Sequence, residues 1–170
     1  MNRFYFCLFG AVFIFLCSFN PVLADEEKMT VNIKRLTLDT ALKIAQAAIT
    51  QCRKEGVQIA VTVVDRGGHP QVMLRDVLAM DITLTVSQQK AHTAMAFNTP
   101  LSQMEKRFTK PFQVPKIDGL LISAGGIPIN VGGNILGGIG VSGAPSGETD
   151  EKCAIAGLEA VRDDLEMQGM

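Results

Sequence analysis

Two segments with the pattern of β-hairpins constrain the fold of this chain most strongly. The first spans residues 58–75 around a turn at 66–69, and the second spans residues 127–142 around a turn at 132–134. Both turns contain paired glycines, which permit the positive φ values that tight turns need. The flanking runs are rich in β-branched residues, which favour strands. Because hairpin strands run antiparallel, the sequence predicts an antiparallel sheet.

Helical patterns flank and separate these hairpins. A first helix is predicted from a cap at Thr37 to about residue 55, because its apolar residues recur three and four apart. A second is predicted over residues 83–97, and residues 99–100 restart a short helix with threonine as the cap. A final helix opens at residues 146–150 and runs to about residue 168. Hairpins separated by helices indicate an α+β fold with helices packed on the sheet.

The N-terminal segment resembles an export signal. Arg3 precedes an apolar run over residues 4–19, and residues 22–24 have the small-residue pattern that signal peptidase cleaves. A retained membrane anchor is the alternative, although the run is shorter than the roughly 20 residues needed to span a bilayer. We therefore predict a signal peptide at residues 1–24 and a periplasmic or secreted protein.

The remaining chain divides into two predicted parts. Residues 25–35 are charged and predict a flexible leader, and residues 36–170 predict a single domain. Signal cleavage removes Arg3 from the 16 basic residues, which leaves 15 against 17 acidic ones and a net charge of −2. This charge excludes the basic surface typical of nucleic-acid binders, and the cleaved chain is not expected to bind a membrane.

Two cysteines, Cys52 and Cys153, remain after cleavage. They lie on the apolar faces of the first and last predicted helices, so they form either a disulfide or two buried thiols. Their spacing does not match a zinc site.

Residues 138–143 match the glycine pattern of dinucleotide-binding folds. That fold needs a further parallel strand after the helix that the glycines open, whereas this chain ends after its last helix. Glycines that allow backbone to pack closely beside a strand explain the pattern better.

The chain has two histidines and no nucleophile motif, so we predict no catalytic residue. His69 lies in the first hairpin turn, where an exposed turn residue and a metal or haem ligand are both possible. His92 lies in the second helix, as either a half-buried histidine or an axial ligand to haem iron. Two histidines cannot supply the three protein ligands of a catalytic zinc site.

Charged residues near these histidines suggest contacts with an acidic ligand. Arg75 and Lys90 either form a solvated face or bind carboxylates. The start of the last helix offers free backbone N–H groups to an anion, although Glu148 and Asp150 can satisfy that positive end themselves.

Three stretches together resemble the GlcG/HbpS family. They are residues 63–75, residues 90–101, and residues 125–157 with their repeated glycines. The resemblance implies a profilin-like fold and homo-oligomers. It implies haem binding for some members, sometimes with slow haem breakdown, and a place beside glycolate, diol or corrinoid metabolism for others.

The chain departs from the family pattern at two positions. The family usually has an acid two residues after the arginine that matches Arg75, where this chain has Val77 with Asp76 beside it. The family usually has an aromatic residue, often tyrosine, at the position of His92.

These observations predict an exported binder of haem or a related tetrapyrrole, with His92 ahead of His69 as the axial ligand. The remaining candidate ligand-binding residues are Arg75, Lys90, Thr93, Gly126, Pro128 and Asp150. The alternatives are an accessory protein or enzyme acting on a small organic acid, and an oligomeric scaffold with no ligand of its own.

Overall fold

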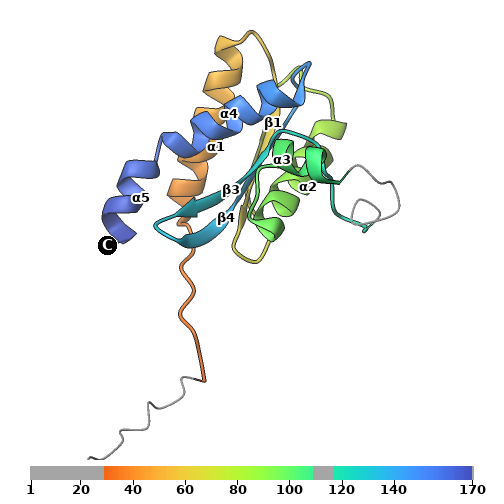
Figure 1. Ribbon diagram of the computed structural model, residues 1–170. Coiled ribbons are helices and arrows are strands. Elements are labelled where there is room, and N and C mark those ends of the chain that lie inside the picture. The colour runs from red at the N-terminus through yellow and green to blue at the C-terminus, as the bar shows by residue number, and fades with distance from the viewer. Residues whose placement is uncertain (1–28, 109–116, 170) are drawn as a thin grey trace, which may run out of the picture. The chain divides into compact units, whose positions relative to one another are not determined.

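A computed structural model describes residues 29–108 and 117–169 (Figure 1). The predicted signal peptide lies outside these residues, as does the start of the predicted leader. Contacts divide the chain into two units, Met1–Asn32 and Ile33–Met170. In the first, residues 29–32 are described and have no regular secondary structure. The second contains α1 (Leu38–Lys54), β1 (Ala60–Asp65), β2 (Pro70–Arg75), α2 (Ile82–Phe97), α3 (Leu101–Arg107), β3 (Gly126–Val131), β4 (Asn134–Ser142), α4 (Gly147–Glu159) and α5 (Arg162–Gly169).

The strands form one antiparallel sheet in the order β2-β1-β4-β3. Each predicted hairpin is present, and β1 and β4 pair in the centre with Val63 opposite Ile139. Helices α1 and α4 lie side by side over one face of the sheet, and α2 covers the other (Figure 1). The predicted α+β fold is therefore confirmed.

Local chemistry explains where α1 begins and which face it buries. Thr37 is its N-cap, and the threonine hydroxyl accepts a hydrogen bond from the Thr40 N–H at 3.3 Å. Its buried residues, spaced three and four apart, form one stripe against the sheet and α4: Ala41, Ile44, Ala45, Ala48, Ile49 and Cys52. This stripe belongs to the main hydrophobic core.

The glycines of β4 let α2 lie close against the sheet. A Cβ atom at Gly138 would stand 2.4 Å from the Ala91 carbonyl oxygen, and one at Gly140 would stand 2.1 Å from that of Ser87. No side chain fits in either gap. The interpretation of these glycines as a close-packing device, and not a dinucleotide site, is confirmed.

Two helix predictions were wrong in detail. The residue before α3 is Pro100, and the Thr99 hydroxyl donates to the Phe97 carbonyl instead of capping the helix. The predicted final helix is two helices, because the chain tightens where the Val161 N–H donates to the Leu158 carbonyl, three residues back. That turn places Val161 in the main core and redirects the chain into α5.

A disulfide joins Cys52 of α1 to Cys153 of α4. Of the two arrangements open from the sequence, the bridge is the one present. It joins the first and the fourth helix on the same face of the sheet, where both cysteines are fully buried.

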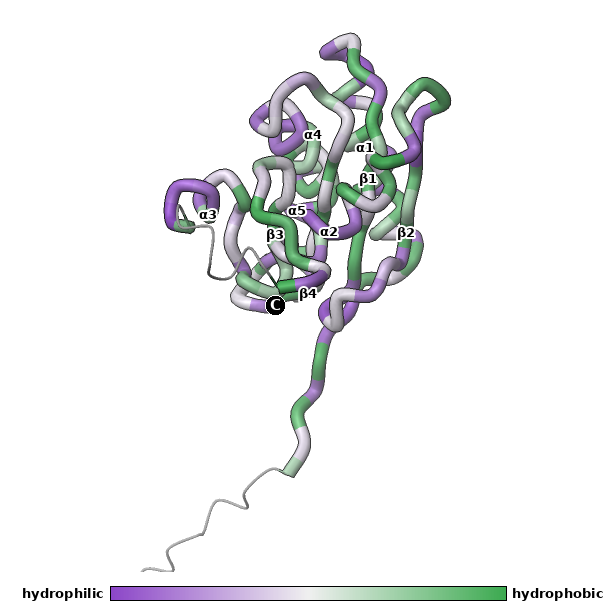
Figure 2. The backbone as a smooth tube through the Cα atoms, turned by 90° about the vertical axis from the view of Figure 1, so that its right-hand side faces the viewer, coloured by the Kyte–Doolittle hydropathy of each residue, from purple (hydrophilic) through white to green (hydrophobic). Residues whose placement is uncertain are grey.

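The segment before α1 differs in one respect from the predicted leader. It lacks helical periodicity, but residues 29–34 alternate between hydrophobic and hydrophilic (Figure 2). Arg35 forms an ion pair with Asp65 at 3.3 Å, and Leu36 is buried in the core. The last residues of the segment are therefore in contact with the domain.

Candidate functional site

Both histidines of the chain line one cavity of about 430 Å³. It lies between the β1–β2 turn and one face of α2. The lining residues are Gly67, Gly68, His69, Thr85, Gln88, Gln89, His92 and Gly119. Their side chains are mostly polar and uncharged, so imidazole is the strongest metal-binding group at the cavity wall.

Helix α2 presents different residues to the cavity and to the sheet. Thr85, Gln88, Gln89 and His92 are spaced three and four apart, so they share the face toward the cavity. The buried face carries small residues such as Ser87 and Ala91, which lie over the β4 glycines. Close packing on that side therefore determines which residues α2 turns toward the cavity.

Asp65, the last residue of β1, organises the turn that forms the opposite wall. One carboxylate oxygen, Oδ1, accepts hydrogen bonds from the backbone N–H groups of Gly67 at 2.8 Å and His69 at 3.0 Å. The Asp65 N–H donates to the His69 carbonyl at 2.8 Å, which closes the turn. The second oxygen, Oδ2, pairs with Arg35.

These contacts shift the acidity of Asp65. Burial by itself would raise the pKa of this carboxyl. The N–H groups of His69 and Gly67, followed by the charges of Arg35 and His69, outweigh burial and hold the pKa below its ordinary value. Asp65 is therefore a carboxylate at neutral pH.

The two imidazoles differ in their surroundings. The side chain of His69 is 81 % exposed, and its Nδ1 lies 3.5 Å from Oδ1 of Asp65. His92 is half-buried on α2, with its ring against the turn. A Cβ atom at Gly68 would stand 2.5 Å from Cδ2 of His92, so only glycine leaves room for this ring.

Lys90 and Asp150 lie inside the protein instead of at this cavity. Each residue is 3 % exposed, and Nζ of Lys90 lies 3.0 Å from Oδ2 of Asp150 and 3.1 Å from the Val141 carbonyl oxygen. Burial raises the pKa of Asp150, although Lys90 and the N–H groups of Ala144 and Gly143 oppose that rise. The expectation of a solvated face is wrong for Lys90.

Three other predicted ligand-binding residues occupy structural positions. The Thr93 hydroxyl donates to the Gln89 carbonyl and accepts from the Leu121 N–H, so it ties a loop to α2. Gly126 lies under α2, where a Cβ atom would stand 2.7 Å from the Lys90 carbonyl oxygen. Pro128 lies on the edge strand β3, where proline is tolerated.

Arg75 is also outside the cavity lining, at the other end of β2 from His69. Its guanidinium donates to the Ala79 carbonyl and lies 3.5 Å from the Asp81 carboxylate. The neighbouring Asp76 is buried and pairs with Arg53, while Val77 is exposed. Val77, which stands where the family usually has an acid, therefore lies in a loop that Arg75 and Arg53 hold in place.

The start of α4 is capped by the protein itself. The Ser146 hydroxyl accepts from the Thr149 N–H at 3.2 Å. The pKa of Glu148 is lowered by its own backbone N–H and by the Ser146 hydroxyl. Asp150 turns inward and accepts from the Ala144 N–H at 3.0 Å. Ser146, and not Asp150, is therefore the cap.

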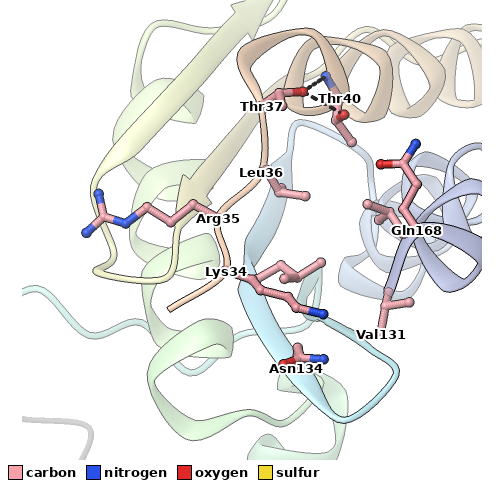
Figure 3. A pocket seen from close by; sticks show the side chains of 10 residues that line it. Lys34, Arg35, Leu36, Thr37, Thr40, Val131, Asn134 and Gln168 are labelled. Carbon is pink, nitrogen blue, oxygen red and sulfur yellow. Dashed lines mark hydrogen bonds between the residues drawn. The ribbon is translucent and has the colours of Figure 1, made fainter. Parts of the chain in front are cut away.

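A second cavity, of about 230 Å³, lies at the start of α1 (Figure 3). Its buried wall is formed by Leu36, Val131 and Leu136, and Asn134 and Gln168 lie at its rim. Neither histidine is part of its lining.

The sequence predicted the two histidines as candidates but did not show that they share a cavity. It also missed Asp65, Gln88 and Gln89. The spacing of Gln88 and Gln89 from His92 would have placed them on its helix face. The role of Asp65 had a weaker signal, an aspartate immediately before a glycine-rich turn.

The part of the chain that the structure describes has neither a membrane-spanning helix nor a cluster of metal ligands. No helix there is long and apolar enough to cross a membrane. No group of three or more histidine, cysteine, aspartate or glutamate side chains there is arranged to hold a metal ion.

Comparison with known proteins places this fold. Among solved structures, HbpS matches with 38 % identity and a TM-score of 0.75, over 78 % of this chain and 94 % of that one. A double mutant of HbpS from Streptomyces reticuli matches with 39 % identity and a TM-score of 0.74, over 84 % of this chain and 97 % of that one.

One more distant solved structure has the same fold, and one more distant protein matches in sequence. The structure of a PduOC:heme complex is 24 % identical with a TM-score of 0.66, and the match covers 74 % of this chain and 94 % of that one. An uncharacterized 15.0 kDa protein from the dhaT-dhaS intergenic region of Citrobacter freundii is 28 % identical over 116 residues, which cover 65 % of this chain and 82 % of that protein.

A family model described as "Haem degrading protein HbpS-like" matches residues 36–159, which include every strand of the sheet, the cavity between the hairpin turn and α2, and the Lys90–Asp150 pair. The chain therefore belongs to the HbpS-like family, as the resemblance predicted.

Proposed function

We propose that this protein binds haem or a related tetrapyrrole in the cavity between the β1–β2 turn and α2. One observation carries the proposal: the only two histidines of the chain, His69 and His92, line the same cavity. Imidazole is a common axial ligand of haem iron. Haem binding at the level of the family supports the assignment.

His92 is the proposed axial ligand, with His69 as the second imidazole. His92 lies on a helix, and its ring is held against Gly68, so binding iron costs little ordering entropy. His69 lies in a turn and is more exposed, so fixing it on iron costs more. His92 and His69 would hold the haem iron, and the haem would supply that iron centre.

The haem carboxylates need partners other than Arg75 and Lys90, because both are engaged elsewhere. Arg66 lies in the same turn as His69, with Nη1 3.8 Å from Sδ of Met95 on α2. We propose that Arg66 meets a propionate. The described residues of the cavity wall include no large apolar side chain to bury a porphyrin, so we propose a protein that handles or senses haem and does not retain it permanently.

The experiment is a haemin titration followed at the Soret band, with wild type, His92→Ala, His69→Ala and the double variant. We expect a shifted band and weaker binding in His92→Ala, a smaller loss in His69→Ala, and loss of the ligated spectrum in the double variant. An unchanged spectrum in His92→Ala refutes the choice of ligand. The absence of a haem spectrum in wild type refutes the function.

Export is a second part of the proposal, and the buried disulfide supports it. Disulfides persist in oxidising compartments and are uncommon in the cytosol, and the bridge joins two helices of the core. Mature protein beginning at Asp25 is the expected result of intact-mass analysis after secretion. A mass that retains residues 1–24 would identify the segment as an anchor.

We also propose that the protein forms homo-oligomers. The loop between β2 and α2 exposes Val77, Leu78, Met80 and, at the helix start, Ile82. Large apolar side chains that lie together at a surface often mark an interface. Sedimentation of wild type and of a Leu78→Ser, Met80→Ser variant tests this, and a wild-type monomer at micromolar concentration would exclude it.

A further inference from the structure

We propose that Asp65 is a positioning residue that orients both imidazoles of the cavity and links them, through Arg35, to the segment before α1. The inference rests on the proposed function, because the imidazoles matter as ligands. The contacts from which it is argued are all present in the protein without a ligand.

Asp65 holds the backbone of the turn. Oδ1 of Asp65 accepts two N–H groups, from Gly67 and His69, and the backbone of Asp65 exchanges hydrogen bonds with Gly68 and His69. Asp65 itself is held in the sheet, where it pairs with Gly137 of β4. The turn is therefore fixed to the centre of the sheet through the side chain and the backbone of one residue.

His69 lies beside the same carboxylate. Its Nδ1 lies 3.5 Å from Oδ1 of Asp65, so the carboxylate favours a proton on Nδ1. Nε2 then carries the free lone pair, which is the form of imidazole that binds a metal. Carboxylates that bind the second nitrogen of a ligating histidine set its tautomer and orientation in this way.

His92 lies against the turn, although Asp65 does not touch it. The ring of His92 packs on Gly68, the residue in the middle of the turn. Gly68 has a φ of +83°, and its N–H donates to the Asp65 carbonyl at 2.9 Å. A displaced turn would remove the surface that holds the His92 ring, so Asp65 acts on His92 through Gly68.

Arg35 connects the segment before α1 to Asp65. Neighbouring residues of an extended segment point to opposite sides, and Figure 3 shows Lys34 toward the second cavity while Arg35 points the other way. Arg35 meets Oδ2 of Asp65, the oxygen that the turn does not use. The segment before α1 is thus attached to the same carboxylate that holds the histidine turn.

Three variants of the mature protein separate these contributions. Asp65→Ala removes both carboxylate oxygens and leaves the backbone carbonyl that accepts from Gly68. Asp65→Asn retains an oxygen for the two N–H groups and for Nδ1 of His69, but presents an amide to Arg35. Arg35→Gln removes only the ion pair and leaves the carboxylate, so it tests the link to the segment separately from the hydrogen bonds of the turn.

The primary measurement is nitrogen NMR of the histidine tautomers and of the amides of residues 66–69, without haem. We expect the Nδ1–H form of His69 in wild type and Asp65→Asn, and its loss in Asp65→Ala together with displaced turn amides and a shifted His92 ring. Arg35→Gln should move the turn amides by less and leave the His69 tautomer unchanged.

The second measurement is haemin affinity, which should fall roughly ten- to hundredfold in Asp65→Ala and be partly rescued in Asp65→Asn. Unchanged tautomers and turn amides in Asp65→Ala overturn the positioning role. Unchanged turn amides in Arg35→Gln overturn the link to the segment. If wild type shows the expected tautomer but binds no haemin, the proposed function fails while the positioning role stands.

Discussion

At the scale of single residues, the space around Gly68 decides the shape of the site. Glycine is needed there for two reasons, a φ of +83° and the ring of His92 within 2.5 Å of where a Cβ would stand. Gly56, at the end of α1, has a similar φ of +75° but nothing within 4 Å of that position. Comparing substitutions at Gly68 and Gly56 therefore separates the cost of backbone strain from the cost of crowding a neighbouring side chain.

The first prediction compares Gly68→Ala with Gly56→Ala. Gly56→Ala should lower the free energy of unfolding by about 1–2 kcal/mol, the cost of a left-handed backbone. Gly68→Ala should cost roughly 1–3 kcal/mol more because of crowding, and it should also weaken haemin binding. Urea denaturation and the Soret titration measure both effects. Equal stability losses in the two variants would contradict the proposed crowding against His92.

The second prediction concerns acid stability at Asp65. Because its pKa is lowered in the folded protein, the carboxylate stabilises the fold above the unfolded pKa of about 3.9, and this stability is lost as the pH falls through the folded pKa. Asp65→Asn lacks this titration. The difference in unfolding free energy between wild type and Asp65→Asn should therefore shrink as the pH falls below about 4. If the difference in unfolding free energy stays constant as the pH falls below about 4, the Asp65 carboxylate does not stabilise the fold in this way.

At the scale of elements, a buried ion pair connects the two faces of the sheet. Lys90 belongs to α2 and Asp150 to α4, which cover opposite faces. Gly125 makes room for the pair, because a Cβ atom there would stand 2.7 Å from Nζ of Lys90. The pair joins the two helix layers where the sheet ends at Ser142 and the chain turns toward α4.

The third prediction is that the two charges depend on each other. Lys90→Met should cost roughly 3–5 kcal/mol, because it leaves a buried carboxylate without its counter-charge. Adding Asp150→Asn should recover most of that loss, since the amide oxygen is neutral and can still accept from the Ala144 N–H. Chemical denaturation of wild type and the three variants gives the coupling energy. If the double variant is as unstable as Lys90→Met, the pair does not behave as a unit.

At the scale of the whole molecule, the disulfide joins residues that are 101 positions apart in the sequence. Closing so long a loop restricts the unfolded chain more than the folded one. The bridge also connects α1 to α4 on the face of the sheet that carries the main core. Its contribution is therefore to global stability and not to the cavity on the other face.

The fourth prediction follows for Cys52→Ala, Cys153→Ala. The double variant should lose about 4–5 kcal/mol of unfolding free energy and keep the wild-type haemin spectrum. Reductant should destabilise wild type and leave the double variant unchanged, which serves as the control. Two free thiols in denatured, unreduced secreted protein would show that the bridge does not form.

The sequence by itself determined what depends on near neighbours. The glycine-rich turns at 66–69 and 132–134, the cap at Thr37 and the spacing of the α1 residues predicted both hairpins and most of the helices, because turn, cap and helix geometry are local. The break at Val161 was missed, because burial of that residue in the core, and not a helix-stop signal, redirects the chain.

Only the tertiary structure decided which distant residues meet. Lys90 and Asp150 are 60 residues apart, and their pairing depends on the order β2-β1-β4-β3, which no local pattern contains. The shared cavity of His69 and His92 likewise depends on how close α2 comes to the β1–β2 turn, a distance that the β4 glycines set. Residue types and spacing therefore identified the two histidines, whereas packing across the sheet brought them to one cavity and placed Lys90 inside the protein.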